Sequence, residues 1–172
     1  MKKNILLFIV SIITLTSYAQ DCGFKNDHSE EESNKKLAWF VKELPEQKLV
    51  ISNDKNDIPT HVLKQLKCAS GGFDIANPDE KYQSDCSGED DKPSRHLKLL
   101  AKNKEYLVMS YNTYNLGISS YHIWIKYNKS GITDIWYTST MGGMVVDSKF
   151  DILNYYKSIS NQEKARTRLI KN

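Results

Sequence analysis

Four runs of strand-forming residues, separated by three short polar turns, occupy the stretch from Arg95 to Ser139. The runs read RHLKLLAK, EYLVMSY, ISSYHIWIKY and ITDIWYTS, and the segments between them read NK, NTYNLG and NKSG. Short turns join antiparallel neighbours, so this pattern predicts a four-stranded antiparallel β-meander over about residues 95–139. Such a sheet needs other elements of the chain to cover its apolar side chains.

Three amphipathic segments can supply that cover. Ser29 begins a capping box, and the apolar spacing after it predicts a helix over residues 30–44. Pro59 stands where the first residue of a second helix would be, and Asp147 or Ser148 would cap a third helix after the meander. The order predicts an α+β fold, with two N-terminal helices and one C-terminal helix packed mainly on one face of the sheet.

The turns of the meander also predict how its strands pair. A two-residue turn in the first hairpin places Lys102 opposite Glu105. In the last hairpin, pairing Lys126 with Ile132 keeps apolar residues together on one face. The other face then shows a polar and aromatic row: Ser120, His122, Trp124, Lys126, Asp134, Trp136 and Thr138.

Residues 1–19 have the pattern of a cleaved signal peptide. Lys2 and Lys3 precede a short apolar run, and small residues end the segment at Ala19. The run is shorter than the roughly 20 apolar residues of a membrane-spanning helix. We therefore expect an exported protein, periplasmic or extracellular, with no transmembrane segment after signal cleavage. Cys22 does not fit a lipidation signal, because an aspartate precedes it.

The rest of the chain has the length of one domain, since roughly 150 residues can bury a sizeable core. We expect an irregular leader over residues 20–28, a single α+β domain over residues 29–160 and a polar basic tail over residues 161–172. The tail would be a solvated, frayed end. Its alternative role is contact with an anionic envelope surface.

The sequence holds three cysteines, and an oxidising compartment favours a disulfide bond between two of them. Cys68 and Cys86 flank a polar loop with little apolar content of its own. We therefore predict a bridge between Cys68 and Cys86. Cys22 would then be the odd thiol, which could pair with another chain or take the place of Cys86.

The polar and aromatic row of the last hairpin holds the candidate site residues. A carboxylate at Asp134 beside the His122 imidazole would raise its pKa and fix its tautomer, as a general base requires. No nucleophile is evident, so His122 and Asp134 are weak catalytic candidates. Exposed aromatic side chains would suit recognition of a protein or a sugar instead, and ordinary packing is the plainest reading. The candidate binding residues are Tyr121, His122, Trp124, Asp134 and Trp136.

Several function classes find no support. No cofactor motif occurs, and the basic residues are not interleaved with aromatic ones as in a nucleic-acid-binding element. The four histidines lack the spacing of a zinc site. An acidic cluster does not match a calcium-binding loop and is expected to be solvated; its members are Asp85, Glu89, Asp90 and Asp91.

These observations favour an exported, non-enzymatic binding or interaction module of the inhibitor or immunity type, with an unidentified protein or glycan partner. The alternatives are a small exported hydrolase that uses His122 and Asp134, and an envelope-associated structural protein. If Trp124 and Trp136 prove fully buried, the loop over residues 71–93 becomes a better contact surface than the sheet face.

Overall fold

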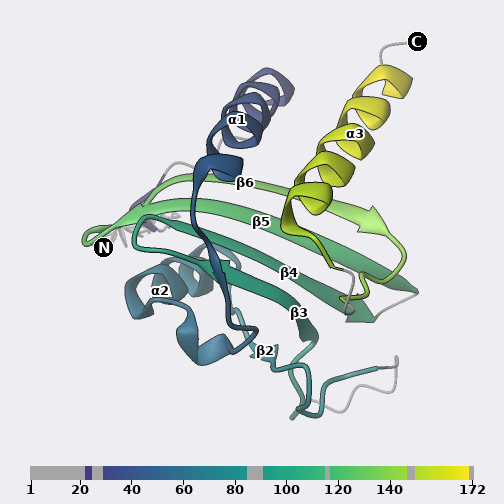
Figure 1. Cartoon of the computed structure of the whole chain (residues 1–172). Coiled ribbons are helices and arrows are strands. Elements are labelled where there is room, and N and C mark those ends of the chain that lie inside the picture. Colours follow the sequence, from purple (N-terminus) through teal and green to yellow (C-terminus); the bar gives the residue numbers. More distant parts are fainter. Residues whose placement is uncertain (1–21, 25–28, 85–90, 115–116, 147–149, 171–172) are drawn as a thin grey trace, which may run out of the picture.

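The structure is a computed structural model that describes residues 22–24, 29–84, 91–114, 117–146 and 150–170 (Figure 1). The predicted signal peptide over residues 1–19 lies outside the described residues. So do Asp147 and Ser148, the predicted caps of the last helix. None of the helices in the described ranges has the length and apolarity needed to cross a membrane.

Four long strands form an antiparallel sheet in which each strand pairs with the next one along the chain. They are β3 (Arg95–Lys102), β4 (Tyr106–Tyr114), β5 (Ile118–Asn128) and β6 (Gly131–Met141). The first seven residues of β4 are all buried, as expected for a strand covered on both faces. The predicted meander and the α+β class are confirmed.

Two very short strands extend the sheet beyond β3. Strand β1 (Val50–Ile51) pairs antiparallel with the end of β3, and β2 (Ile75–Ala76) pairs parallel with its beginning. The described sheet therefore has six strands rather than the four of the predicted meander.

The helices lie on both faces of the sheet (Figure 1). Helices α1 (Glu30–Glu43) and α3 (Ile152–Ile170) share one face, as predicted, whereas α2 (Thr60–Ala69) covers the other. Helix α1 begins as the capping box indicates, because the Ser29 hydroxyl accepts a hydrogen bond from the Glu32 backbone at 3.2 Å. We call the two sides of the sheet the α1/α3 face and the α2 face.

Each face has its own hydrophobic core. Apolar side chains of α1 and α3 meet the even-numbered residues of β4, β5 and β6, since side chains alternate along a strand. The buried members on the α1/α3 face include Phe40, Leu44, Val108, Trp124, Trp136, Tyr155 and Ile159. Those on the α2 face include Val62, Leu66, Leu100, Leu107, Met109, Ile123, Ile125 and Ile135.

The predicted register of the first hairpin is wrong by two residues. Lys102 lies opposite Leu107 rather than Glu105, because the two turn residues are Lys104 and Glu105 rather than Asn103 and Lys104. The Asn103 side chain favours this turn, since its oxygen accepts from the backbone N–H groups of Glu105 and Tyr106. A shift of two residues leaves Leu99 and Ala101 on one face, as predicted, whereas a bulge between Leu97 and Leu99 turns Leu97 to the α2 face.

The last hairpin differs from its prediction in the same way. Lys126 lies opposite Asp134 rather than Ile132, and Trp124 lies opposite Trp136. A bulge after Lys126 accommodates the shift. The two predicted faces of this hairpin are therefore correct, although the residue pairs across it are not.

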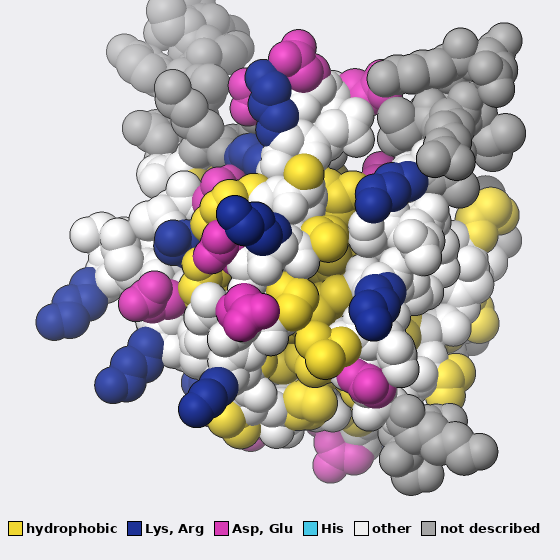
Figure 2. Space-filling model, turned by 45° about the horizontal axis from the view of Figure 1, so that its top comes forward, with side chains coloured by type: hydrophobic (Ala, Val, Ile, Leu, Met, Phe, Trp, Pro, Cys, Tyr) yellow, Lys and Arg dark blue, Asp and Glu magenta, His cyan; other side chains and the backbone are white. Residues whose placement is uncertain are grey.

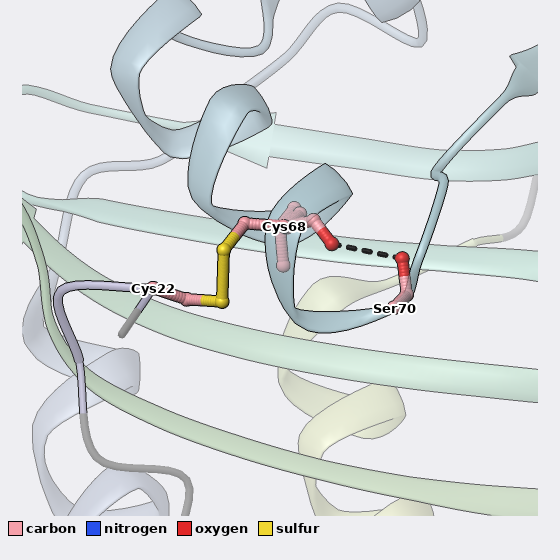
Figure 3. The surroundings of a disulfide bond; sticks show 4 residues. Cys22, Cys68 and Ser70 are labelled. Atoms are coloured by element: carbon pink, nitrogen blue, oxygen red, sulfur yellow. Dashed lines mark hydrogen bonds between the residues drawn. A yellow bond between two sulfur atoms is a disulfide. The ribbon is translucent and has the colours of Figure 1, made fainter. Parts of the chain in front are cut away.

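The N-terminal segment is tied to the α2 face by a disulfide bond. Cys22 bonds to Cys68 near the end of α2, 46 positions along the sequence (Figure 3). The predicted Cys68–Cys86 bridge is therefore wrong. The alternative in which Cys22 takes the place of Cys86 is the one observed, because the fold brings the chain before α1 against the end of α2. Cys86 itself lies outside the described residues.

Gln65 makes a second tie on the α2 face. Its side-chain oxygen accepts a hydrogen bond from the Ile132 backbone at 2.6 Å, which joins α2 to the turn between β5 and β6. Gly131 permits this approach, because a Cβ atom there would lie 2.3 Å from the Gln65 oxygen. Its φ of +130° also disfavours any other residue.

Helix α3 begins later and continues further than the sequence indicated. Asp151 caps it, since its carboxylate accepts from the Leu153 backbone at 2.8 Å. The helix extends to Ile170, so the predicted frayed tail from residue 161 is helical over most of its length. An apolar face with Tyr155, Tyr156 and Ile159 buried against the sheet holds the helix in place.

Candidate functional site

The two tryptophans of the predicted site are core residues. Trp124 is 0% exposed and Trp136 is 2% exposed, and their rings lie 4.5 Å apart beneath α1 and α3. Phe40 of α1 and Tyr156 of α3 contact the Trp124 ring edge to face. The row of polar and aromatic residues does share one face, but helices cover it. A ligand therefore has no access to these indole rings.

The structure does not bring His122 and Asp134 together. His122 lies opposite Thr138, four positions along β6 from Asp134, a separation of roughly 13 Å for an extended strand. Asp134 forms an ion pair with Lys36 of α1 at 3.1 Å and accepts from the Ile135 backbone. Among the described residues, no carboxylate bonds to the His122 ring, so the predicted acid–base pair lacks its geometry.

Tyr121, the remaining predicted binding residue, lies on the opposite face of the sheet. Its ring stacks on that of Tyr111, with 5.3 Å between centroids and 8° between planes. The guanidinium of Arg95 lies over both Tyr111 and Phe73. Because neighbouring positions of a strand point to opposite faces, Tyr121 and His122 cannot line one site.

The described part of the loop over residues 71–93 is anchored rather than free. Phe73 is buried in the α2-face core, and Tyr82 stacks on His96 with 3.8 Å between ring centroids. Lys55 holds Glu80 in an ion pair. Residues 85–90, with most of the acidic cluster, lie outside the described part of the chain, and the described residues contain no group of three or more metal-ligating side chains.

A cleft of about 410 Å³ opens where β6 ends and α3 begins. The beginning of β5 and the end of β6 form one wall, and the first three turns of α3 form the other. Its volume falls in the lower part of the range for small-molecule sites. The polar side chains on its walls are mostly uncharged: Ser120, His122, Thr140, Asn154, Ser158 and Gln162.

The wall beyond β6 is a glycine turn held by buried polar residues. Gly142 has a φ of +91°, which turns the chain away from the strand. The Ser120 hydroxyl bonds to the Gly142 carbonyl and to the Asn112 side chain, both at 2.8 Å. The Met144 backbone N–H donates to the Ser120 oxygen at 2.7 Å. These bonds fix the shape of the cleft from below, since Ser120 and Asn112 are both buried.

A closed cluster of polar groups lies under the floor of the cleft. The Ser110 hydroxyl oxygen lies 2.8 Å from both His122 Nδ1 and the Tyr155 hydroxyl, and the Trp124 indole N–H donates to that tyrosine at 3.2 Å. The other ring nitrogen, His122 Nε2, lies 3.3 Å from Thr140 Oγ1 on the cleft wall. His122 therefore connects the buried cluster to the cleft.

Burial controls the protonation of this cluster. Removal from water lowers the pKa of His122 to about 4, so the imidazole is neutral at physiological pH. Burial likewise raises the pKa of Tyr155 to about 12, which keeps its hydroxyl protonated. The cluster thus presents hydrogen-bonding groups to the cleft without charge.

His122 was a predicted site residue, whereas its partners Ser110 and Tyr155 were not. Ser110 stands in an otherwise apolar run, LVMSY, where a hydroxyl must find a buried partner. That single polar residue was the signal available from the sequence. Tyr155 and the α3 wall gave no such signal, because Tyr155 reads as one apolar residue among several on its helix.

Comparisons with protein-family models, curated proteins and solved structures find no match to this chain. The candidate site is therefore assigned from the geometry and chemistry of the cleft and of the polar cluster beneath it.

Proposed function

We propose that this chain is an exported, non-enzymatic binding module whose ligand site is the cleft between α3 and the ends of β5 and β6. The cleft carries the proposal because it combines a concave wall with several hydrogen-bonding side chains. Export is supported by the signal-peptide pattern of residues 1–19 and by the Cys22–Cys68 bond, which is typical of oxidising compartments.

The support beneath the cleft favours binding over a purely structural role. Buried polar groups cost stability unless every partner is satisfied, and an apolar floor would pack more simply. Here Ser110, His122 and Tyr155 are all buried and all hydrogen-bonded below the cleft wall. A rigid, fully bonded support of this kind holds a recognition group in a fixed position.

A fragment screen followed by two-dimensional NMR tests the proposal with the purified, oxidised protein. We expect the ligands found to shift the amide signals of Thr140, Asn154 and Gln162 most strongly. Ser158→Trp should fill the cleft and abolish the shifts, because Ser158 is an exposed lining residue. Lys157→Trp, the adjacent exposed position outside the lining, is the matched control. Fragments that bind equally to Ser158→Trp would refute the cleft as the site.

A protein partner of the inhibitor or immunity type is a second candidate, favoured by the apolar surface. Figure 2 shows a strip of hydrophobic side chains between α1 and α3, with charged side chains along both sides. Near the cleft, Met141 is 98% exposed and Val145 is 80% exposed. A pull-down from culture supernatant and envelope fractions tests this function. Met141→Ser should weaken any specific capture, whereas capture unaffected by Met141→Ser and Val145→Ser would count against it.

The envelope-associated alternative rests on the last residues of the chain. The basic side chains of Arg166, Arg168 and Lys171 lie outside the described side chains, so this role stays a prediction. Deletion of residues 161–172 with unchanged surface association would remove it.

A further inference from the structure

The protons of the buried cluster can all be paired only if Nδ1 of His122 accepts a hydrogen bond. An indole N–H can only donate, so the Tyr155 oxygen accepts from Trp124. Two hydroxyl protons remain, one on Tyr155 and one on Ser110. The hydrogen bond between these two hydroxyls uses one of the protons. The other proton has His122 Nδ1 as its acceptor among the described groups.

A protonated Nδ1 would break this arrangement. It would add a donor to a cluster that already has one hydroxyl proton for each acceptor, and one buried hydroxyl would lose its partner. An unmade hydrogen bond of that kind costs about 1–3 kcal/mol. With Nδ1 unprotonated, one of the two hydroxyls donates to Nδ1 and the other donates to that hydroxyl, so no buried proton is left over.

A neutral imidazole carries its single proton on the other nitrogen when Nδ1 accepts. His122 Nε2 therefore bears the proton and donates to Thr140 Oγ1, 3.3 Å away on the cleft wall. The Thr140 hydroxyl in turn keeps its own proton available for the cleft. Ser110, Tyr155 and His122 are positioning residues, since they act on a ligand only through Thr140.

The charge of the cleft narrows the ligand class. Of the described residues that line it, Asp151 alone carries a charge. Its two carboxylate oxygens already accept from the Leu153 backbone and the Asn154 side chain at the start of α3. An ionic ligand would lose its hydration without gaining a dedicated counter-charge, which is costly in a partly buried site.

We propose that the cleft binds a neutral saccharide, and that the Nε2–H of His122, by donating to Thr140 Oγ1, orients the Thr140 hydroxyl as a specificity-determining donor toward one sugar oxygen. This inference rests on the proposed function of the cleft. Sugar hydroxyls both donate and accept, which matches the amides of Asn154 and Gln162 and the hydroxyl of Thr140. Phe150 and Met144 add apolar surface for the C–H face of a sugar ring.

The tautomer can be measured without any ligand. Long-range ¹H–¹⁵N NMR distinguishes a protonated from an unprotonated ring nitrogen, and the expected result is a proton on Nε2 of His122 and none on Nδ1. Tyr155→Phe should perturb the Nδ1 signal more than the Nε2 signal. A proton found on Nδ1 would overturn the inference, whatever binds in the cleft.

The ligand class is tested by NMR titration with four related sugars. N-acetylglucosamine and methyl glucoside are the neutral probes, glucosamine is the cationic probe and glucuronate is the anionic probe. We expect the neutral sugars to shift the cleft signals and the charged sugars to bind roughly tenfold more weakly or not at all. Equal or tighter binding of a charged sugar would overturn the inference.

Two substitutions of the histidine separate its two nitrogens. His122→Asn keeps a polar group facing Ser110 but has nothing at the Nε2 position, so neutral-sugar binding should fall roughly tenfold. His122→Gln reaches the Nε2 position with an amide donor and should retain more of the affinity. His61→Asn, on the α2 face, is the control and should leave binding unchanged; thermal melting of each variant verifies that it folds.

Failure of the inference and failure of the proposed function give different results. If non-saccharide fragments bind the cleft while the sugars do not, the saccharide inference is overturned and the binding function survives. If neither fragments nor sugars perturb the cleft signals, both are overturned.

Discussion

On the α2 face of the sheet, apolar side chains of α2 and of the strands meet, with no buried polar cluster among the residues that the structure describes. A disulfide bond and Gln65 tie this face together. On the α1/α3 face, an apolar half around Trp124 and Trp136 adjoins a polar group made by Ser110, His122 and Tyr155. The same sheet therefore has one face closed by packing and cross-links and another that carries hydrogen-bonding chemistry.

This difference separates stability from recognition. Apolar packing and a covalent tie add stability without restricting what the surface can bind. A buried polar cluster contributes less stability but specifies the position and the protons of its members. The α2 face therefore stabilises the fold, and the polar cluster near α3 on the other face supplies the hydrogen-bonding groups for recognition.

Loss of the disulfide bond should produce the largest loss of stability. The bond closes a loop with a sequence separation of 46, which corresponds to about 4 kcal/mol in the chain-entropy model. Cys22→Ala should therefore lower the free energy of unfolding by up to this amount, as urea denaturation measures. Cys86→Ser is the matched control and should change little. A large loss in Cys86→Ser with none in Cys22→Ala would show that the α2 face is cross-linked differently.

Acid should weaken the α1/α3 face through His122. Its pKa is about 4 in the folded protein and about 6.5 when unfolded, so the unfolded state binds more protons between these values. The free energy of unfolding should therefore fall by about 3 kcal/mol as the pH drops from roughly 6.5 to 4, with no contribution above that window. Urea unfolding at several pH values measures the change.

The variant His122→Asn isolates this effect from other titrating groups. Burial also lowers the pKa of His96, and the Glu163 carboxylate accepts from Thr138 opposite His122, so both groups remain in the variant. The difference between the wild type and the variant in how the free energy of unfolding changes with pH should equal the contribution of His122. An unchanged slope would mean that the polar cluster does not govern the acid response.

Removal of one hydroxyl should have a smaller effect on the same face. Tyr155→Phe leaves the buried Trp124 N–H without its acceptor and should cost about 1–3 kcal/mol. Tyr156→Phe is an adjacent control, because the Tyr156 hydroxyl is buried without a hydrogen-bond partner among the described residues. Its loss should cost little or even stabilise the fold. Equal effects of the two variants, by thermal or urea unfolding, would contradict the assigned cluster.

The smallest effect is expected from the hydrogen bond that joins α2 to the last hairpin. Gln65→Ala removes the acceptor of the Ile132 N–H and should cost about 1 kcal/mol. Lys64→Ala, at an exposed neighbouring position on α2, should be neutral within a few tenths of a kcal/mol by urea unfolding. A neutral Gln65→Ala would show that apolar packing alone holds α2 on its face.

Much of the architecture was predictable because local patterns and burial agree. The spacing of Leu37 and Phe40 places α1 on the core, and the alternation of β5 and β6 assigns each side chain to a face. Pair registers were wrong because the Asn103 turn and the bulge after Lys126 depend on details that alternation does not encode. Side chains alternate along a strand with a period of two residues, so a register that is wrong by two residues gives the same assignment of side chains to faces.

The site was less predictable because it depends on contacts between distant segments. Ser110 and Tyr155 are 45 positions apart, and nothing local indicates that they meet. Trp124 and Trp136 were candidates for ligand contact beside the plainer expectation of packing, and α1 and α3 bury both. The alternation of a strand assigns a side chain to a face but does not identify what covers that face.

The bond between Gln65 and Ile132 has a consequence for the order of folding. The meander consists of hairpins between neighbouring segments, which form quickly, whereas this bond joins residues 67 positions apart. Helix α2 is therefore expected to dock after the β5–β6 turn has formed. In stopped-flow kinetics, Gln65→Ala should then speed unfolding and leave the folding rate almost unchanged. The hydrogen bond between Gln65 and Ile132 would then form late in folding, after the sheet has assembled.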